Sequence, residues 1–71
     1  MKTLTVICPV YNEEEVIESF YRELKEVLSG ISEQYSSRIL FVVDPGTDES
    51  VTILKQIATR DSAVQIIVLS S

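Results

Sequence analysis

Two short segments of the sequence gather the side chains that could bind a ligand. Each follows an apolar run: residues 9–15 read PVYNEEE, and residues 44–49 read DPGTDE. Together they hold six of the eleven acidic residues. The ring of Tyr11 offers a flat apolar surface, and the carboxylates accept hydrogen bonds. This combination suits the N–H groups of a nucleobase and the hydroxyls of a ribose.

Other kinds of site fit the composition poorly. The two glycines, Gly30 and Gly46, cannot form a glycine-rich phosphate loop, and the glutamates at 13–15 would repel a bare phosphate. With no histidine and a single cysteine, Cys8, the chain can form no internal disulfide, and any metal would need oxygen ligands, as Mg²⁺, Mn²⁺ and Ca²⁺ do. The net charge of −5 disfavours nucleic acid as a partner.

The length and hydropathy predict one small domain in the cytoplasm. Seventy-one residues suffice for a single core. The apolar runs, such as residues 39–43 and 66–69, are far shorter than the roughly 20 residues of a membrane span, and the start of the chain lacks a signal-peptide pattern.

Alternating strands and helices are expected to position the two acidic segments. Apolar, β-branched runs predict strands at 4–8, 38–43 and 64–69, and apolar residues at helical spacing predict helices at 12–29 and 48–60.

Local signals mark where these helices should begin and end. Asn12 and Glu15 have the spacing of a capping box, and Thr47 is placed to cap the second helix. Gly30 is expected to end the first helix in the left-handed conformation.

The β-α-β-α-β order predicts a parallel sheet with right-handed crossovers. The strand order 3-2-1 would place both helices on one face, whereas an order with the first strand in the middle would place one helix on each face. Periodicity does not choose between them. In either case the carboxyl ends of the strands form one edge, where open α/β sheets bind ligands.

The two acidic segments also carry a resemblance to a known family. Residues 6–14 (VICPVYNEE) resemble the opening of family 2 glycosyltransferases, in particular the dolichyl-phosphate mannose synthase and undecaprenyl-phosphate sugar transferase branch. Residues 42–50 (VVDPGTDES) are similar, without gaps, to the V-D-D-G-S-x-D-G-T segment of that family. The resemblance implies the strand order 3-2-1 and the N-terminal half of a GT-A, Rossmann-like domain, with residues 1–71 as its truncated nucleotide-recognition part.

The resemblance also implies a set of residues that bind the nucleotide sugar. Pro9 and Tyr11 would flank the base, Glu13 would lie near the ribose or base, Asp44 would accept a hydrogen bond from the base, and Val42 would line the same pocket. The second motif departs from the family pattern, because Val43, Pro45 and Gly46 replace an aspartate, a glycine or acid, and a serine.

The activity that the resemblance implies is transfer of a hexose from a nucleoside-diphosphate sugar to a polyprenyl phosphate or similar acceptor, at the cytosolic face of a membrane. Mg²⁺ or Mn²⁺ is expected for the full-length enzyme. The metal-binding D-x-D motif and the catalytic base of the family have no match in these 71 residues. We therefore expect no catalytic residue, no metal ligand and no activity in this chain alone.

Simpler interpretations remain open for several of these residues. Tyr11 could be a packing residue, Asp44 could serve only its turn, and Glu14 and Glu15 read as a solvated helix start. Cys8 reads as a small buried apolar residue. Two alternative functions are a receiver-like signalling domain with Asp44 in its acidic pocket, and a structural fragment that self-associates.

Self-association is expected from the sheet itself. If both helices cover one face, the other face exposes apolar side chains from all three strands, and the first strand is an open edge. The sequence therefore predicts a homo-oligomer.

Overall fold

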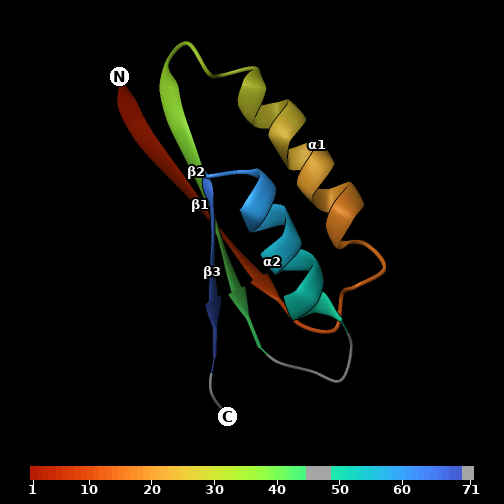
Figure 1. Cartoon of the computed structure of the whole chain (residues 1–71). Coiled ribbons are helices and arrows are strands. Elements are labelled where there is room, and N and C mark those ends of the chain that lie inside the picture. The colour runs from red at the N-terminus through yellow and green to blue at the C-terminus, as the bar shows by residue number, and fades with distance from the viewer. Residues whose placement is uncertain (45–48, 70–71) are drawn as a thin grey trace.

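The computed structural model describes residues 1–44 and 49–69, which form three strands and two helices (Figure 1). In chain order the elements are β1 (Lys2–Val10), α1 (Ile17–Ser29), β2 (Tyr35–Val43), α2 (Ser50–Arg60) and β3 (Val64–Val68). The predicted alternation of strands and helices is confirmed, and β1 and β2 are each longer than the apolar runs that predicted them.

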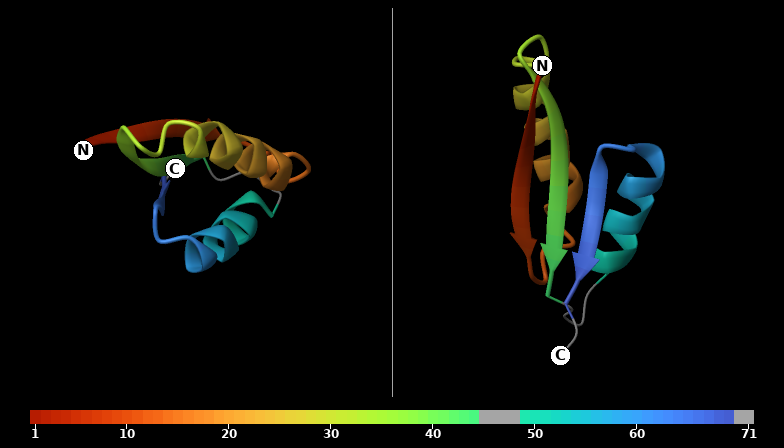
Figure 2. Two further views of the ribbon diagram at one scale, coloured as in Figure 1. Left: turned by 90° about the horizontal axis from the view of Figure 1, so that it is seen from above. Right: turned by 90° about the vertical axis from the view of Figure 1, so that its left-hand side faces the viewer.

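The strands form one parallel sheet in the order β1-β2-β3. Val10 pairs with Val43 at one end of β1, and Ile39 pairs with Val64 at the start of β3. Both helices lie on the same side of this sheet (Figure 2). The order 3-2-1 is therefore confirmed, and the arrangement with the first strand in the middle is wrong.

The core lies between the helices and one face of the sheet. Alternate strand residues point into it, since successive side chains of a strand point to opposite faces. Phe41, Leu54 and Ile57 are fully buried. The remaining core side chains are Cys8, Val10, Ile17, Leu28, Ile39, Val43 and Val64. Burial of such side chains contributes roughly 1.5 to 3 kcal/mol each, which makes this layer the main source of stability.

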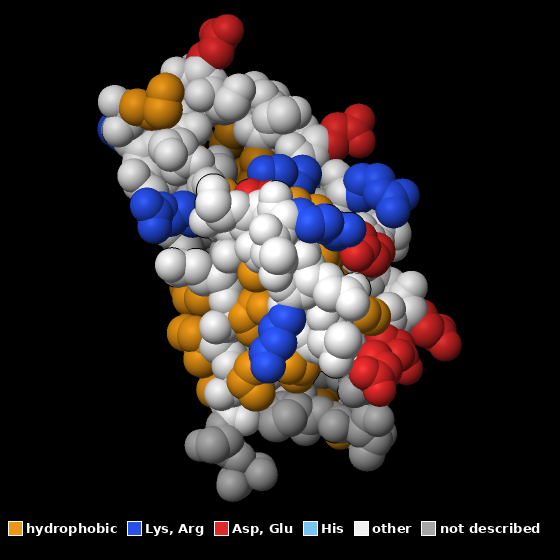
Figure 3. Space-filling view, viewed as in Figure 1, with side chains coloured by type: hydrophobic (Ala, Val, Ile, Leu, Met, Phe, Trp, Pro, Cys, Tyr) orange, Lys and Arg blue, Asp and Glu red, His pale blue; other side chains and the backbone are white. Residues whose placement is uncertain are grey.

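Within residues 1–44 and 49–69, no helix covers the opposite face of the sheet. Ile7 is 64% exposed, and Ile67 and Leu69 are nearly half exposed. Figure 3 shows hydrophobic side chains gathered on the sheet side of the molecule and acidic side chains mainly on the helical side. The strands are thus apolar at both odd and even positions, although only one of their faces is covered.

The predicted end of α1 at residue 29 is confirmed, but its predicted start and the left-handed cap at Gly30 are wrong. The helix begins at Ile17, with Val16 in the cap position, and not at Asn12. Asn12 has a φ of 49°, a left-handed conformation that asparagine tolerates better than most residues. The chain therefore turns there and needs four more residues to enter the helix. Gly30 keeps a right-handed conformation with a φ of −68°, because its N–H bonds to the carbonyl of Val27 and the turn continues to β2.

The second helix begins two residues later than predicted. Glu49 occupies the cap position of α2. The proposed cap Thr47 and its neighbours Pro45, Gly46 and Asp48 lie outside the described residues. None of the described helices is long and apolar enough to cross a membrane.

Candidate functional site at the carboxyl edge of the sheet

A cavity of about 390 Å³ lies at the carboxyl edge of β1 and β2. The structure places all five predicted site residues along it. Its lining consists of Pro9, Val10, Tyr11, Glu13, Val42, Asp44 and Leu69. The parallel register brings them together, because Pro9 pairs with Val42 and the two acidic segments therefore leave the sheet side by side. Val10 and Leu69 were not predicted.

Asp44 is placed by its backbone. Its N–H donates to the carbonyl of Val10 at 2.9 Å, which extends the β1–β2 ladder by one residue beyond Val43. The residue is exposed, so its carboxylate can accept hydrogen bonds from a ligand in the cavity.

Tyr11 stands on the other side of the same edge. It is the first residue after β1, and 57% of its surface is exposed. An aromatic ring with that exposure can stack on a flat ligand. The left-handed turn at Asn12 follows directly, so Tyr11 sits where the chain reverses away from the sheet.

Glu13 is held by a contact between the two acidic segments. Its N–H donates to Oγ of Ser50 at 3.1 Å, and its carbonyl accepts from the N–H groups of Val16 and Ile17. Ser50 is only 2% exposed. This side chain, the first of α2, ties the segment after β1 to the segment after β2.

Sequence reasoning missed Ser50, since a serine at a helix start reads as a solvated or capping residue. It also missed Glu14, which was predicted to be only a solvated charge. One carboxylate oxygen of Glu14 accepts the N–H of Glu49 at 3.3 Å. The signal that could have revealed both contacts is the placement of two helix starts at the same sheet edge.

The charged side chains that line this cavity are hydrogen-bond acceptors. Two carboxylates, from Glu13 and Asp44, line the cavity, and no described lysine or arginine does so. The cavity therefore suits groups that donate hydrogen bonds and repels bare phosphate. The described residues contain no group of three side chains that could hold a metal ion, so this part of the chain does not fit a metal centre.

Cys8 faces the core and not the cavity. It is buried, and burial raises the pKa of its thiol. A thiol with a raised pKa is a poor nucleophile, which agrees with its prediction as a small buried apolar residue.

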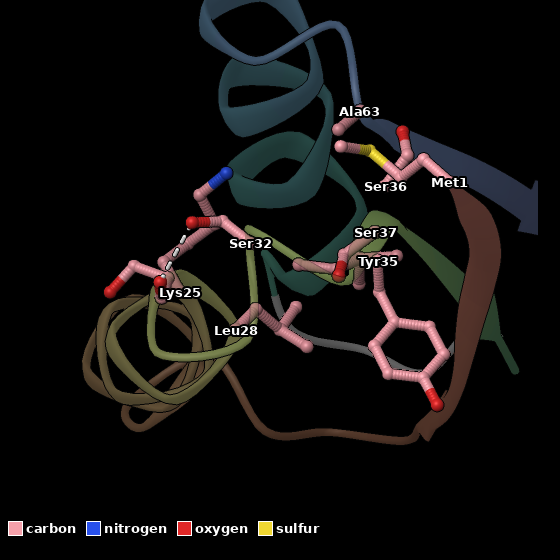
Figure 4. A pocket seen from close by; sticks show the side chains of 10 residues that line it. Met1, Lys25, Leu28, Ser32, Tyr35, Ser36, Ser37 and Ala63 are labelled. Atoms are coloured by element: carbon pink, nitrogen blue, oxygen red, sulfur yellow. Dashed lines mark hydrogen bonds between the residues drawn. The ribbon is translucent and has the colours of Figure 1, made fainter.

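A second hollow, of about 400 Å³, lies at the opposite end of the strands (Figure 4). Lys25 on its rim is paired with Asp61 at 3.0 Å, and the hydroxyls of Ser29 and Ser32 donate to backbone carbonyls. Oγ of Ser37 is buried without a hydrogen-bond partner among the described residues. Three of the polar side chains that line this hollow are thus engaged with the protein itself.

Comparison with known proteins places the chain in a family. The family model described as glycosyl transferase family 2 matches residues 5–71. An uncharacterized glycosyltransferase of Bacillus subtilis, YkcC, is 43% identical over 63 residues, which are 89% of this chain and 19% of that protein. The chain thus spans about a fifth of the length of this curated relative. No solved structure matches. Since the family match covers nearly the whole chain, including both acidic segments, the chain belongs to glycosyl transferase family 2.

Proposed function

We propose that this chain forms the donor-recognition part of a hexosyltransferase that uses a nucleoside-diphosphate sugar. The observation that carries the proposal is the edge cavity, where residues 33 positions apart in sequence, Tyr11 and Asp44, line one space together with Glu13. Family membership supports a glycosyltransferase and does not favour the receiver-like alternative.

Each of the five predicted site residues has a chemical part in this proposal. The ring of Tyr11 stacks on the base, and Pro9 and Val42 form apolar walls beside it. The carboxylate of Asp44 accepts a hydrogen bond from an N–H group of the base, and Glu13 accepts one from a ribose hydroxyl. These carboxylates give the diphosphate no favourable charge, so the phosphates must be held by groups other than those described here.

The remaining chemistry is assigned to residues outside this chain. We take the acceptor to be a polyprenyl phosphate or similar molecule, as in the dolichyl-phosphate mannose synthase branch, and the full-length enzyme to act at the cytosolic face of a membrane. Mg²⁺ or Mn²⁺ would supply charge neutralisation at the diphosphate of the full-length enzyme. The described residues contain no group of three side chains that could hold this metal ion.

Because this proposal gives the chain donor recognition alone, it predicts that the 71-residue chain by itself transfers no sugar. Its sequence has no D-x-D motif to hold a metal at the diphosphate. We also expect its affinity for nucleotides to be millimolar or weaker. A radiolabelled-donor assay on the purified chain checks the first point, and sugar transfer above the buffer blank would contradict it.

The role of Asp44 can be tested in a complete transferase that contains this segment. Asp44→Ala should weaken binding of the nucleoside-diphosphate donor by about 1 to 3 kcal/mol, because a base N–H group then lacks its acceptor in a closed pocket. Isothermal titration calorimetry measures this directly. The ladder bond of Asp44 uses its backbone N–H, so the substitution leaves the sheet intact.

Glu33→Ala is the matched control for this experiment. Glu33 is an exposed acid in the turn before β2, at the opposite end of the sheet from the cavity. Its removal changes the net charge by the same amount and should leave donor affinity unchanged. Equal donor affinity for the Asp44→Ala and Glu33→Ala variants would remove Asp44 from the site.

A further inference from the structure

Within residues 1–44 and 49–69, Ser50 is the only polar residue that the fold buries; 2% of its surface is exposed. A serine hydroxyl that is removed from water needs a hydrogen-bond partner in the protein. Oγ of Ser50 accepts the N–H of Glu13 at 3.1 Å, across 37 positions of sequence. The buried hydroxyl therefore contacts a residue that lines the edge cavity.

Both backbone polar groups of Glu13 are engaged. Its carbonyl accepts the N–H groups of Val16 and Ile17 at 3.0 and 3.1 Å, and these bonds lie within the segment that leads into α1. They cannot place that segment relative to the rest of the site. The bond to Ser50 can, because Ser50 is the first residue of α2, which follows β2 in the chain. Since the backbone sets the direction of the Cα–Cβ bond, this contact also directs the side chain of Glu13.

The other acid of the cavity, Asp44, is anchored in a different way. Its N–H donates to the carbonyl of Val10 at 2.9 Å, at the end of the β1–β2 ladder. Asp44 therefore keeps its place in the sheet when the contact at Ser50 is lost. The position of Glu13 relative to Asp44 depends on Ser50.

A second contact joins the same two segments and is weaker. A carboxylate oxygen of Glu14 accepts the N–H of Glu49 at 3.3 Å, and this bond is exposed to water. Water competes for an exposed hydrogen bond, whereas the bond between Ser50 and Glu13 is partly buried. Of these two contacts, the bond from Ser50 is thus the one that can hold Glu13 firmly.

We propose that Ser50 is a positioning residue, which holds the Glu13 carboxylate beside a ribose hydroxyl and makes the site select donors that carry the ribose hydroxyls. This inference rests on the proposed function, in which Glu13 accepts a hydrogen bond from the ribose. Ser50 itself is buried and does not line the cavity. A residue that only stabilised the fold would affect every donor equally. A residue that acts through Glu13 affects only donors with a hydroxyl for Glu13 to accept.

The experiment uses a complete transferase that contains this segment, and two ligands. Calorimetry first identifies which of the uridine, guanosine, cytidine and adenosine diphosphates the wild-type enzyme binds most tightly. The second ligand is the 2′,3′-dideoxy form of that nucleotide, which lacks both ribose hydroxyls. Binding of the dideoxy form by a variant also shows that the variant is folded.

Ser50→Ala should lower the affinity for the ribonucleotide by roughly three- to tenfold, the effect of about one hydrogen bond. It should change the affinity for the dideoxy form by less than about twofold, since Glu13 makes no bond to that ligand. Thr52→Ala, at an exposed position on the same helix, is the control and should change neither affinity. Equal losses of affinity for the two ligands in Ser50→Ala would overturn the proposal.

A double-mutant cycle gives a second, independent test. Glu13→Ala removes the carboxylate and keeps the backbone N–H that bonds to Ser50. In that background Ser50→Ala should change the affinity for the ribonucleotide by less than about twofold, because the group that it positions is gone. Additive losses would contradict a role through Glu13.

The wild-type enzyme separates failure of this inference from failure of the proposed function. If it binds none of the four diphosphates, the proposed function is wrong and the inference falls with it. If it binds the ribonucleotide and the dideoxy form equally well, while Asp44→Ala still weakens binding, donor recognition stands. The role of Ser50 through Glu13 is then wrong.

Discussion

Tyr11 exposes 57% of its surface at the carboxyl edge, where the chain has just left β1. Replacing it should therefore cost little folding energy, within about 0.5 kcal/mol, as for surface positions generally. If the ring stacks on a base, its removal should instead weaken ligand binding. The same residue thus separates the packing interpretation from the binding interpretation.

We predict that Tyr11→Ala in a complete transferase weakens donor binding by about 1 to 3 kcal/mol, the usual contribution of an aromatic ring stacked on a base. Tyr11→Phe should bind the donor nearly as well as the wild type, because it keeps the ring and loses only the hydroxyl. Calorimetry with the nucleoside diphosphate measures both. An Ala variant with wild-type affinity would show that the ring does not touch the base.

The positions of the site residues could be predicted from the sequence more readily than the contacts that hold these residues in place. Tyr11 and Asp44 could be placed at one edge because each ends an apolar strand, and parallel strands end together. The contact of Glu13 with Ser50 could not be predicted from the sequence, because it depends on the distance of the two helix starts from the sheet. Whether the cavity binds a nucleotide sugar remains a prediction.

Ser50 links two elements that adjoin the cavity. Its buried hydroxyl accepts the N–H of Glu13, and it stands in the first turn of α2. We predict that Ser50→Ala destabilises the chain by about 1 to 2 kcal/mol, because a partly buried N–H group then loses its partner. Urea unfolding at one fixed protein concentration measures the change.

Thr52→Ala serves as the control for that substitution. Thr52 is exposed on the same helix, so its loss should change the unfolding free energy by less than about 0.5 kcal/mol. Equal effects of the two substitutions would mean that the Ser50 contact does not hold the segment after β1. In a complete transferase, Ser50→Ala should also weaken donor binding, since Glu13 is then less firmly placed.

The helix starts were the part of the fold that the sequence predicted least well. The apolar period predicts α1 correctly, but the spacing of Asn12 and Glu15 ahead of it also predicts a capping box. The backbone at Asn12 adopts a left-handed turn instead, and the helix begins only when Val16 and Ile17 bond to the carbonyl of Glu13. The turn by which the chain leaves β1 thus prevents the capping box that the local sequence predicts.

At the scale of the whole molecule, the sheet order came from the resemblance and not from periodicity. The strands are apolar at both odd and even positions, a pattern typical of sheets covered on both faces. Here the helices cover one face, and Ile7 and Ile67 remain exposed on the other. The chain has a solvent-accessible area of 4987 Å², compared with about 4,450 Å² for a compact monomer of 8.0 kDa. Surface that a compact monomer would bury is thus available for association.

One polar cluster joins the two helices to the start of β3. The carboxylate of Asp61 accepts the hydroxyl of Tyr21 at 2.6 Å and the N–H of Ala63 at 3.0 Å, and it pairs with Lys25 at 3.0 Å. Burial by itself would raise the pKa of Asp61, but the hydrogen bonds from Tyr21, Lys25 and Ala63 outweigh it and hold this pKa below its ordinary value. Burial and the bond to Asp61 raise the pKa of Tyr21 to about 12.

These two shifts predict how the stability of the molecule depends on pH. The lowered pKa of Asp61 contributes stability that is present above its unfolded value of 3.8 and is lost as the pH falls further. The raised pKa of Tyr21 contributes stability that is complete below its unfolded value of 10.0 and is lost between pH 10 and about 12. The unfolding free energy should therefore fall at both ends of the pH range because of one cluster.

Three variants test whether Asp61 causes the acid loss of stability and Tyr21 the alkaline loss. Urea unfolding of each variant is measured from pH 3 to 11.5 at fixed protein concentration. Tyr21→Phe should be less stable than the wild type at pH 7, because Asp61 loses a hydrogen bond, but the difference should shrink above pH 10. Asp61→Asn should be less stable at pH 7 and approach the wild type below pH 3.8. Arg60→Gln breaks the exposed pair with Glu18 and removes a charge that lowers the pKa of Tyr21. It should change stability by less than about 1 kcal/mol and keep both the acid and the alkaline loss of stability. If the Tyr21→Phe curve ran parallel to the wild-type curve through pH 11.5, ionisation of Tyr21 would not be the cause of the alkaline loss.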